Sequence, residues 1–366
     1  MEKIKIAMLV NDMNINGISM VIMNYCKNLD KSKFDISVIS GTPINDFYKS
    51  QCREFNIKLY ELPARKQKKL KYFQALYRVL KQKFDIVHVH GNSATISIEL
   101  LIAKICGVKV RIAHSHNTTC DHIKIHKLLW PLFRQVYTHG LACGQQAGKW
   151  MFHNGKFYVL PNAFETANFI YDNEARQRIR NELKLDNKYV IGHIGRFNNQ
   201  KNHPFLLRIF TEIAKKREDA YLLLVGNGPD FEEVQKLISE HPFKDRIIVY
   251  GECKDTGKLY SAFDVFALPS RHEGLVCVLL EAQINGLYSV ASTAVPDEVK
   301  ITENVEFIDL KEKPEKWAEH ILNSHDIDRD NMYNQYFESI QKYDIHQSVK
   351  NLEFLYIKFL NEQRKI

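Results

Sequence analysis

Short apolar runs alternate with segments of helical periodicity along the first half of the chain. The runs have the length of buried strands, and none approaches the roughly 20 residues that a membrane-spanning helix needs. Between them, apolar residues recur every three or four positions, as they do on the buried face of a helix. Strands that alternate with helices predict βαβ units and a parallel sheet. The expected strands are Ile4–Val10, Ile36–Ser40, Ile86–His90, Val110–His114 and Gly140–Cys143.

The same alternation restarts after the segment Pro161–Glu165. We therefore expect an α/β fold with two Rossmann-like, doubly wound parallel-sheet domains that face each other across a cleft, with ligands at the carboxyl ends of the strands. The helical, aromatic-rich tail has no strand of its own and is expected to pack back on the first domain. The expected domains are 1–165 and 166–340, followed by a returning helix, 341–366. Strands of the second domain are expected at Tyr189–Ile194, Ala220–Val225, Arg246–Tyr250, Val265–Leu268 and Tyr288–Ala291.

The charge balance narrows the classes of ligand. The chain has 51 Lys and Arg residues against 43 Asp and Glu, a formal net charge of +8, which favours anionic partners. The basic residues are not interleaved with stacking aromatics on a recognisable module, so no nucleic acid is expected as a partner. Seven scattered cysteines without a Cys-x-x-Cys pair indicate reduced thiols in a cytoplasmic protein.

Two cations follow the strand Tyr189–Ile194. Gly195 allows a tight exit from the strand, and Arg196 and Lys201 come within the next few residues. A guanidinium fork and an ammonium point charge at this position suit a diphosphate, although a solvated basic loop has the same composition. Gly226 follows another expected strand. The sequence there fits a loop whose backbone approaches a ligand closely, and it fits a plain turn equally well.

Two carboxylates, Glu273 and Glu281, lie eight positions apart. On one helix they would be about 12 Å apart, too far for the spacing of about 5 Å at which two carboxylates act on one glycosidic bond. The spacing suits acceptors for hydroxyls at two ends of a long ligand, with phosphates held by N–H groups at the helix N-terminus. The alternative is a dipole-stabilised first-turn residue at 273 and a surface residue at 281. The N–H groups that could hold the phosphates in the first interpretation belong to Gly274, Leu275 and Val276.

Four histidines lie at the ends of two expected strands, as His88 and His90 and as His114 and His116. Alternate spacing places each pair on one face of its strand. Zinc is an option for such pairs, but no nearby cysteine or carboxylate completes a site, so no metal is expected. The acidic run 326–330 lacks the Glu that closes a calcium loop and indicates a turn or a helix cap.

Taken in order, these motifs resemble those of the retaining glycosyltransferases of family 4, which have the GT-B fold and use nucleotide-sugar donors without a metal ion. The resemblance runs along nearly the whole chain and is greatest to bacterial capsule and exopolysaccharide enzymes. It rests on an ordered set of segments: Gly195–Phe197 with Lys201 and Asn202, Gly226–Gly228, Asp264–Ser270, Glu273 with Glu281, and Ile112–Asn117.

The resemblance implies a role for each matching residue. Arg196 and Lys201 would hold the donor diphosphate, Glu273 the sugar hydroxyls and Glu281 the ribose, while His116 would bind a donor hydroxyl or shuttle a proton. Gly17 would let backbone approach the donor or the acceptor, unless it only begins a helix. The catalytic candidates are Arg196, Lys201, Glu273 and His116; the donor-binding set adds Gly17, Gly195, Gly226, Gly274, Leu275, Val276 and Glu281; the acceptor-side candidates are Asn16, His90, His114 and Asn117.

The expected activity is retaining, metal-independent hexosyl transfer from a nucleotide diphosphate sugar, a UDP-sugar by preference. The acceptor would be a growing glycan or lipid-linked oligosaccharide in capsule or exopolysaccharide biosynthesis, bound by the first domain, with the donor on the second. A nucleotide-sugar epimerase or hydrolase of the same fold and a non-catalytic nucleotide-sugar-binding protein are the alternatives.

Two basic stretches, 65–71 and 123–137, combine Lys and Arg with apolar residues. Such segments suit an anionic membrane surface, where each cation contributes about 1 kcal/mol, and they equally suit a solvated basic helix. The expected location is therefore the cytoplasm, with peripheral association at the inner face of the membrane as the further expectation.

Overall fold

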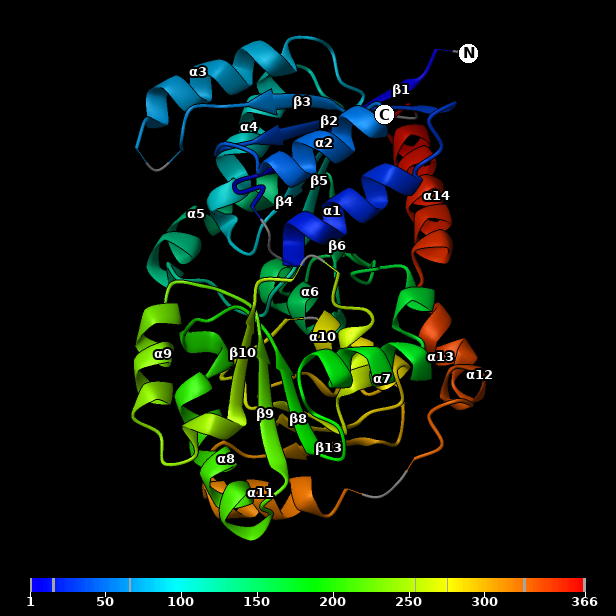
Figure 1. The fold of residues 1–366 in the computed structure, drawn as a ribbon. Coiled ribbons are helices and arrows are strands. Elements are labelled where there is room, and N and C mark those ends of the chain that lie inside the picture. Colours follow the sequence, from blue (N-terminus) through cyan, green and yellow to red (C-terminus); the bar gives the residue numbers. More distant parts are fainter. Residues whose placement is uncertain are drawn as a thin grey trace. The chain divides into compact units, whose positions relative to one another are not determined.

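The chain divides into two compact units, which are described here separately (Figure 1). Unit 1 comprises Met1–Phe164 and Lys342–Ile366, and unit 2 comprises Glu165–Gln341. The structure, a computed structural model, describes residues 2–14, 17–65, 67–253, 255–274, 276–324 and 327–364.

The described residues of unit 1 form a seven-stranded parallel sheet in the order β3-β2-β1-β4-β5-β6-β7. The order runs outward in both directions from β1 and β4, which makes the sheet doubly wound and places its switch point between these two strands. The central strands are buried over almost their whole length, which explains their continuous apolar runs. The strands are β1 (Ile4–Val10), β2 (Phe34–Ser40), β3 (Lys58–Glu61), β4 (Ile86–His90), β5 (Val110–Ser115), β6 (His139–Ala142) and β7 (Tyr158–Val159).

Helices cover this sheet, and the last of them comes from the carboxyl end of the chain (Figure 1). Helix α14 packs against α1, and its Leu352, Tyr356 and Phe359 are buried in the core of unit 1. The prediction that the tail returns to the first domain is therefore confirmed. The helices are α1 (Gly17–Asn28), α2 (Asp46–Glu54), α3 (Lys69–Leu80), α4 (Ser97–Ile105), α5 (Ile123–Val136), α6 (Gln145–Phe152) and α14 (Ile345–Arg364), with a 3-10 turn η1 (Ala94–Ile96).

The described residues of unit 2 form a six-stranded parallel sheet in the order β10-β9-β8-β11-β12-β13. This sheet is also doubly wound, so the expected pair of Rossmann-like sheets is present. Its strands are β8 (Tyr189–Ile194), β9 (Ala220–Val225), β10 (Ile247–Gly251), β11 (Val265–Leu268), β12 (Tyr288–Ser292) and β13 (Val305–Ile308).

Helix α8 illustrates how the sequence sets an element of unit 2. Asn202 takes a left-handed backbone conformation (φ 58°, ψ 43°) directly before the helix, and Pro204 occupies its first turn, where no N–H is needed. Apolar residues at helical spacing then bury one face against the sheet. The helices of unit 2 are α7 (Asn173–Glu182), α8 (His203–Lys216), α9 (Phe231–Ser239), α10 (Cys277–Ile284), α11 (Pro314–Leu322), α12 (Met332–Gln335) and α13 (Phe337–Gln341). Its 3-10 turns are η2 (Thr166–Phe169), η3 (Asn199–Lys201), η4 (Lys244–Arg246), η5 (Leu259–Ala262) and η6 (Asp297–Val299).

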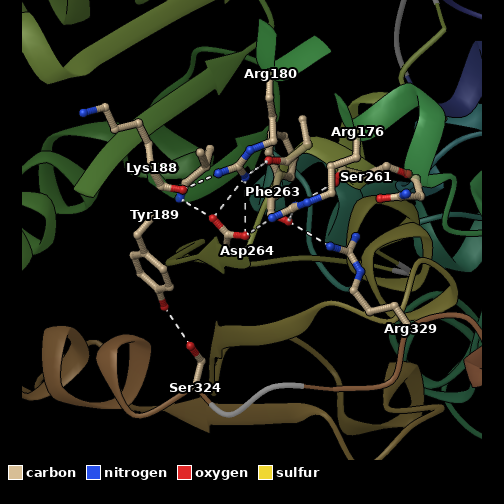
Figure 2. A network of polar contacts seen from close by, with 12 residues as sticks. Arg176, Arg180, Lys188, Tyr189, Ser261, Phe263, Asp264, Ser324 and Arg329 are labelled. Carbon is tan, nitrogen blue, oxygen red and sulfur yellow. Dashed lines mark hydrogen bonds and ion pairs between the residues drawn. The ribbon is translucent and has the colours of Figure 1, made fainter. Parts of the chain in front are cut away.

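A network of arginines fixes the amino ends of the strands in unit 2 (Figure 2). Asp264, just before β11, accepts from Arg176 and Arg180 of α7 and from the backbone N–H of Val190. Arg329 donates to the carbonyls of Tyr260, Phe263 and Asn285. Burial lowers the pKa of Arg329 to about 9. Because these guanidinium groups have acceptors inside the protein, Arg180 can be buried and Arg176 and Arg329 half-buried. They hold α7 and the segment after α11 to the sheet.

Candidate functional site

The loops that follow β8 and β11 meet at the carboxyl edge of the unit 2 sheet. The backbone N–H of Arg271 donates to the Gln200 carbonyl at 2.8 Å. Asn202 links the same two loops: its amide donates to the Pro269 carbonyl at 3.2 Å, and its Oδ1 accepts from Arg271 at 2.8 Å. The two segments that carry the candidate cation Lys201 and the candidate acid Glu273 are therefore held as one structure.

The loop after β9 packs under the loop after β8, and two glycines allow this contact. Gly226 has φ +138°, and a Cβ built there would lie 2.1 Å from the Gly195 carbonyl oxygen. A Cβ on Gly228 would lie 2.2 Å from the Phe197 carbonyl oxygen. Phe197 and Asn227 are also joined backbone to backbone at 3.0 Å. The glycines are therefore required by the packing of one loop on the other.

Lys201 and Glu273 form an ion pair in this edge. The Lys201 Nζ lies 2.6 Å from Glu273 Oε1, and the two side chains are only 12% and 8% exposed. Gln200 Nε2 donates to the other carboxylate oxygen at 2.9 Å and to the His272 carbonyl at 3.0 Å. Both oxygens of Glu273 are thus fixed by neighbouring donors, which gives the carboxylate one orientation. Arg196, in the same loop, is exposed.

Glu281 lies inside unit 2, which excludes the surface position that the sequence left open. It is 3% exposed on α10, and the Tyr260 hydroxyl donates to its Oε2 at 2.6 Å. Burial raises the pKa of Glu281 to about 7, against the opposing effects of the Tyr260 hydrogen bond and the Lys201 charge. This carboxyl group therefore titrates near neutral pH.

Glu273 and Glu281 do not share one helix, the arrangement for which their spacing was considered. Helix α10 begins at Cys277 with Val276 as its N-cap residue, so Glu273 and Gly274 lie in the preceding loop. The Val276 backbone (φ −90°, ψ 87°) is not helical. Gly274 and Val276 are buried, so the apolar run of the helix continues into the loop before it. The sequence pattern reports this burial, but it does not show that the backbone there is not helical. Leu275 lies outside the described residues.

In unit 1, four imidazoles stack together: His88 and His90 lie on β4, His114 lies on β5 and His116 directly follows β5. Ring centroids lie 4.2 Å apart for His88 and His90 and 4.1 Å apart for His114 and His116. Across the strands, His88 Nε2 and His114 Nδ1 are 3.1 Å apart, and His90 Nδ1 and His116 Nε2 are 2.9 Å apart. Burial lowers the pKa of all four side chains, that of His116 to about 4, so they are neutral at pH 7.

The hydrogen bonds of His116 fix its tautomer. Its Nδ1 lies 2.9 Å from Asn162 Oδ1, an oxygen that only accepts, so Nδ1 carries the proton. The Nε2 of His116 then accepts from the Nδ1–H of His90. Both ring nitrogens of His116 are therefore engaged within unit 1. The buried Nε2 of His90 has no hydrogen-bond partner within the described part of the chain.

The histidine cluster also meets the spacing of a candidate metal site. Among the described residues, His88, His90 and His114 each place a ring nitrogen within 4.8 Å of the others. Zinc requires nitrogens at 2.0–2.1 Å whose lone pairs point at the ion. In this cluster the rings are stacked and nitrogens face one another in pairs, so a common ion would need the His88–His114 contact to open. The geometry is that of a hydrogen-bonded network.

The other candidates of unit 1 have simpler positions. Gly17 is the exposed first residue of α1. Asn117 follows β5, and its Oδ1 accepts from the Thr118 N–H at 2.7 Å. His114 is completely buried in the imidazole stack. Asn16 lies outside the described residues.

Three residues of these sites were missed at the level of sequence: Gln200, Tyr260 and Asn162. Each is an uncharged side chain that contacts a candidate residue at least 21 positions away in the chain. The carboxylate of Glu281 within an apolar helix was the available signal, since it called for a buried donor. Nothing in the local sequence identified Tyr260 as that donor.

A pair of doubly wound sheets, with an acid–cation cluster at the carboxyl edge of the second, defines a nucleotide-binding α/β protein of the GT-B class. Comparison with known proteins agrees. Residues 15–168 match the model described as Glycosyltransferase Family 4, and residues 188–326 match the model described as Glycosyl transferases group 1. The chain therefore belongs to the family 4, group 1 glycosyltransferases, which use nucleotide-sugar donors.

Curated relatives span most of the chain. It is similar to the putative glycosyltransferase EpsF of Bacillus subtilis, at 29% identity over 86% of each chain. It is also similar to the UDP-Gal:alpha-D-GlcNAc-diphosphoundecaprenol alpha-1,3-galactosyltransferase of Escherichia coli, at 26% identity over 80% of each chain. These identities indicate distant homology.

Solved structures share the fold. Anabaena Alr3699/HepE, in complex with UDP and glucose, matches with a TM-score of 0.81 over 96% of this chain and 99% of that chain, at 16% identity. The lipopolysaccharide outer core galactosyltransferase WaaB matches with a TM-score of 0.68 over 96% and 98% of the two chains, at 18% identity. In the part of our chain that the structure describes, every helix is too short or too polar to cross a membrane.

Proposed function

We propose that the protein transfers a hexose from a UDP-sugar, with retention at the anomeric carbon, to a growing glycan or lipid-linked oligosaccharide in capsule or exopolysaccharide biosynthesis. The observation that carries this proposal is the cluster of Lys201, Gln200 and Glu273 next to buried Glu281 at the carboxyl edge of a doubly wound sheet. Nucleotides bind at this edge of such sheets.

The ammonium group of Lys201 has enough N–H donors to bind two hydrogen-bond acceptors at once. An ammonium group carries three N–H donors, and the contact with Glu273 uses one of them. A second can reach a donor phosphate while the first keeps Glu273 in place. Together with exposed Arg196, Lys201 would stabilise the departing diphosphate by fixed charge, with no metal ion in that role. Glu273 would accept from the sugar hydroxyls and Glu281 from the ribose.

Retention is proposed to proceed on one face of the sugar, with the leaving phosphate taking the acceptor proton. Glu273 accepts from both Lys201 and Gln200, and a carboxylate whose two oxygens are held by donors is a weak nucleophile. The test is mass spectrometry of the enzyme quenched during turnover. A glycosyl adduct on a carboxylate would overturn this route, and unmodified protein throughout turnover supports it.

UDP and a lipid-linked acceptor are suggested by the relatives. The Escherichia coli relative is named for a UDP-Gal donor and a diphosphoundecaprenol-linked acceptor, and a further relative, AmsD of Erwinia amylovora, for amylovoran biosynthesis. In unit 1, His116, His90, His114, Asn117, Asn16 and Gly17 are the proposed contributors to sugar or acceptor binding. Because His116 is engaged at both nitrogens, the proposal requires a ligand hydroxyl to compete with His90 or Asn162.

A basic and apolar face of unit 1 suits an anionic membrane, where such an acceptor resides. Helix α4 packs between α3 and α5, and each of the three exposes large apolar side chains, including Leu70, Ile105 and Leu128. Lys124 and Lys127 are exposed on α5. We propose peripheral binding of this face at the cytoplasmic surface of the membrane.

Vesicle binding tests the membrane proposal. The protein should sediment with vesicles that contain phosphatidylglycerol and should be released by salt, because exposed charges are screened. Lys124→Glu with Lys127→Glu should abolish sedimentation. Lys215→Glu with Lys216→Glu, an exposed pair at the end of α8 in unit 2, should not. Equal loss in both double variants would show a general charge effect and refute this face.

The enzymatic proposal is tested with a panel of nucleotides and nucleotide sugars. UDP and one UDP-sugar should raise the melting temperature more than the GDP and ADP counterparts do, since a ligand of the folded state stabilises it. Transfer of labelled sugar to a lipid-linked acceptor should then be observed. Release of free sugar or formation of an epimer without acceptor would favour the hydrolase or epimerase alternative. Binding without any turnover would favour a non-catalytic nucleotide-sugar-binding protein.

A further inference from the structure

The hydroxyl of Tyr260 is the polar tip of an otherwise apolar, completely buried side chain in η5. The ring packs edge-on or tilted against Phe169, Phe263 and Phe266, with centroids 5.8–5.9 Å away. These contacts fix the ring, and so they fix where its hydroxyl points. A buried tyrosine in such surroundings delivers its hydroxyl to one place.

That place is the carboxyl group of Glu281. The Tyr260 oxygen lies 2.6 Å from Glu281 Oε2 and 3.3 Å from the Val278 carbonyl. A hydroxyl has one proton to donate, and the short contact with the carboxylate is the stronger of the two. The bond occupies Oε2 and leaves Oε1 outside it, so the carboxyl group has a held oxygen and a second oxygen with a defined direction.

Two groups around Glu281 act on its charge: Tyr260 of η5 donates to it, and Lys201 of η3 lies close enough to favour the carboxylate form. The Cys277 thiol, in the first turn of the same helix as Glu281, interacts electrostatically with Tyr260. Burial opposes ionisation more strongly than Tyr260 and Lys201 favour it, and so raises the pKa of Glu281. Loss of the Tyr260 hydrogen bond would therefore raise the pKa of Glu281 further and favour its neutral form.

We propose that Tyr260 is a positioning residue of the donor site, which holds Glu281 as an oriented carboxylate and thereby sets the affinity for the nucleotide. This inference rests on the proposed function, in which Glu281 accepts from the ribose. It adds a residue that does not itself touch the donor, and it makes nucleotide affinity depend on pH through one buried hydrogen bond.

The test is calorimetric titration of UDP at a series of pH values between 5.5 and 8.5. Tyr260→Phe removes one oxygen atom from a packed ring and keeps the ring in place. We expect UDP to bind roughly 10-fold more weakly to this variant at pH 7, the effect of a hydrogen bond to a charged group. The pH at which affinity reaches half its maximum should move upward, because the carboxylate has lost a donor.

Two further variants distinguish positioning from a structural role. Incorporation of 3-fluorotyrosine at position 260 gives a stronger donor of nearly the same shape, and it should tighten UDP binding and move the midpoint downward. Tyr189→Phe is the matched control: this buried tyrosine donates to the Ile321 carbonyl and contacts Ser324 (Figure 2), and among the described residues its hydroxyl has no carboxylate partner. It should leave both UDP affinity and the pH midpoint unchanged.

Glu281→Gln separates the failure of this inference from the failure of the proposed function. If Glu281→Gln weakens UDP binding and abolishes its pH dependence while Tyr260→Phe matches the parent protein, the role of Tyr260 is refuted. If Glu281→Gln binds UDP as the parent does, the role of Glu281 in the proposed function fails first. Tyr260→Phe combined with Glu281→Gln should be no weaker than Glu281→Gln alone, since Tyr260 acts through that carboxylate.

Discussion

The ammonium group of Lys201 lies 2.6 Å from Glu273 Oε1, and both side chains are almost entirely removed from solvent. From the sequence, the two residues were expected to have separate roles, Lys201 as a cation that binds phosphate and Glu273 as an acid that binds sugar hydroxyls. The structure joins them in one ion pair, so each is the counter-ion of the other before any donor binds. A change to either residue therefore has two consequences, one for the fold of the loop and one for the chemistry.

Lys201→Ala should lower turnover by about 100- to 1,000-fold, as loss of a fixed transition-state donor does. It should also destabilise unit 2, because Glu273 is left buried without its cation. Lys201→Ala combined with Glu273→Gln should recover stability but not turnover. Urea unfolding and initial-rate kinetics on the parent protein and the two variants check this. Near-normal rates for Lys201→Ala would contradict the role of the cation.

Gly226→Ala should destabilise the protein by about 3 kcal/mol or more, since the new Cβ would meet the backbone of Gly195 and the clash cannot be relieved by a side-chain rotation. UDP affinity should fall with it, because the loop that carries Lys201 must move. Gly251→Ala is the matched control, with φ +85° but nothing within 4 Å of the added atom. It should cost about 1–2 kcal/mol of backbone strain and leave UDP affinity unchanged. Similar melting temperatures for the two variants would contradict the packing argument.

The arrangement of apolar runs was sufficient to predict both sheets, because the central strands are buried on two faces and carry unbroken apolar sequences. Strands β3, β7 and β13 were not predicted. They lie at the edges of their sheets, where one side of the strand faces no neighbour, and their residues are partly exposed. A short edge strand lacks the apolar run by which a buried strand is recognised in the sequence.

The charged residues of the candidate site could be predicted from the sequence, because they lie together in short loops. The residues that contact them from distant positions in the chain could not. Arg196, Lys201 and Glu273 stand out in the sequence, but Gln200 is 73 positions from the carboxylate it holds. Arg329 shows the same limit. It lies in an acidic run that indicated only a turn, whereas the structure packs its half-buried side chain against three backbone carbonyls. Partners of this kind are set by the topology of the chain.

Protein stability should depend on pH through Glu281. Its pKa is raised from an ordinary value of 4.5 to about 7 in the folded protein. The folded state therefore binds this proton more tightly than the unfolded chain does, which adds about 3 kcal/mol to the free energy of unfolding. This stabilisation is fully present below pH about 4.5 and is lost as pH rises to and through about 7.

Urea unfolding of the parent protein and of Glu281→Gln at several pH values measures this effect. The difference in unfolding free energy between the two should shift in favour of the glutamine variant as pH rises from 5 to 8. Other titrating groups are shared by both proteins and cancel in the difference. A difference independent of pH would show that Glu281 has an ordinary pKa in the folded state.

Asn162→Asp should convert His116 from a neutral to a chargeable imidazole. Asn162 Oδ1 accepts from His116 Nδ1 at 2.9 Å, and burial lowers the pKa of His116 to about 4. A carboxylate in the same position stabilises the imidazolium form, so the pKa of His116 should rise by at least one unit. Titration of the His116 ring proton by NMR measures this directly.

Asn162→Ala is the companion variant, and it removes the acceptor without adding charge. The Nδ1–H of His116 is then left unpaired in a buried site, at a cost of about 1–3 kcal/mol in the free energy of unfolding. The pKa of His116 should not rise, because no negative charge has been added. An equal rise in both variants would mean that water reaches the imidazole stack once Asn162 is altered, and it would show that the added carboxylate is not the cause of the rise.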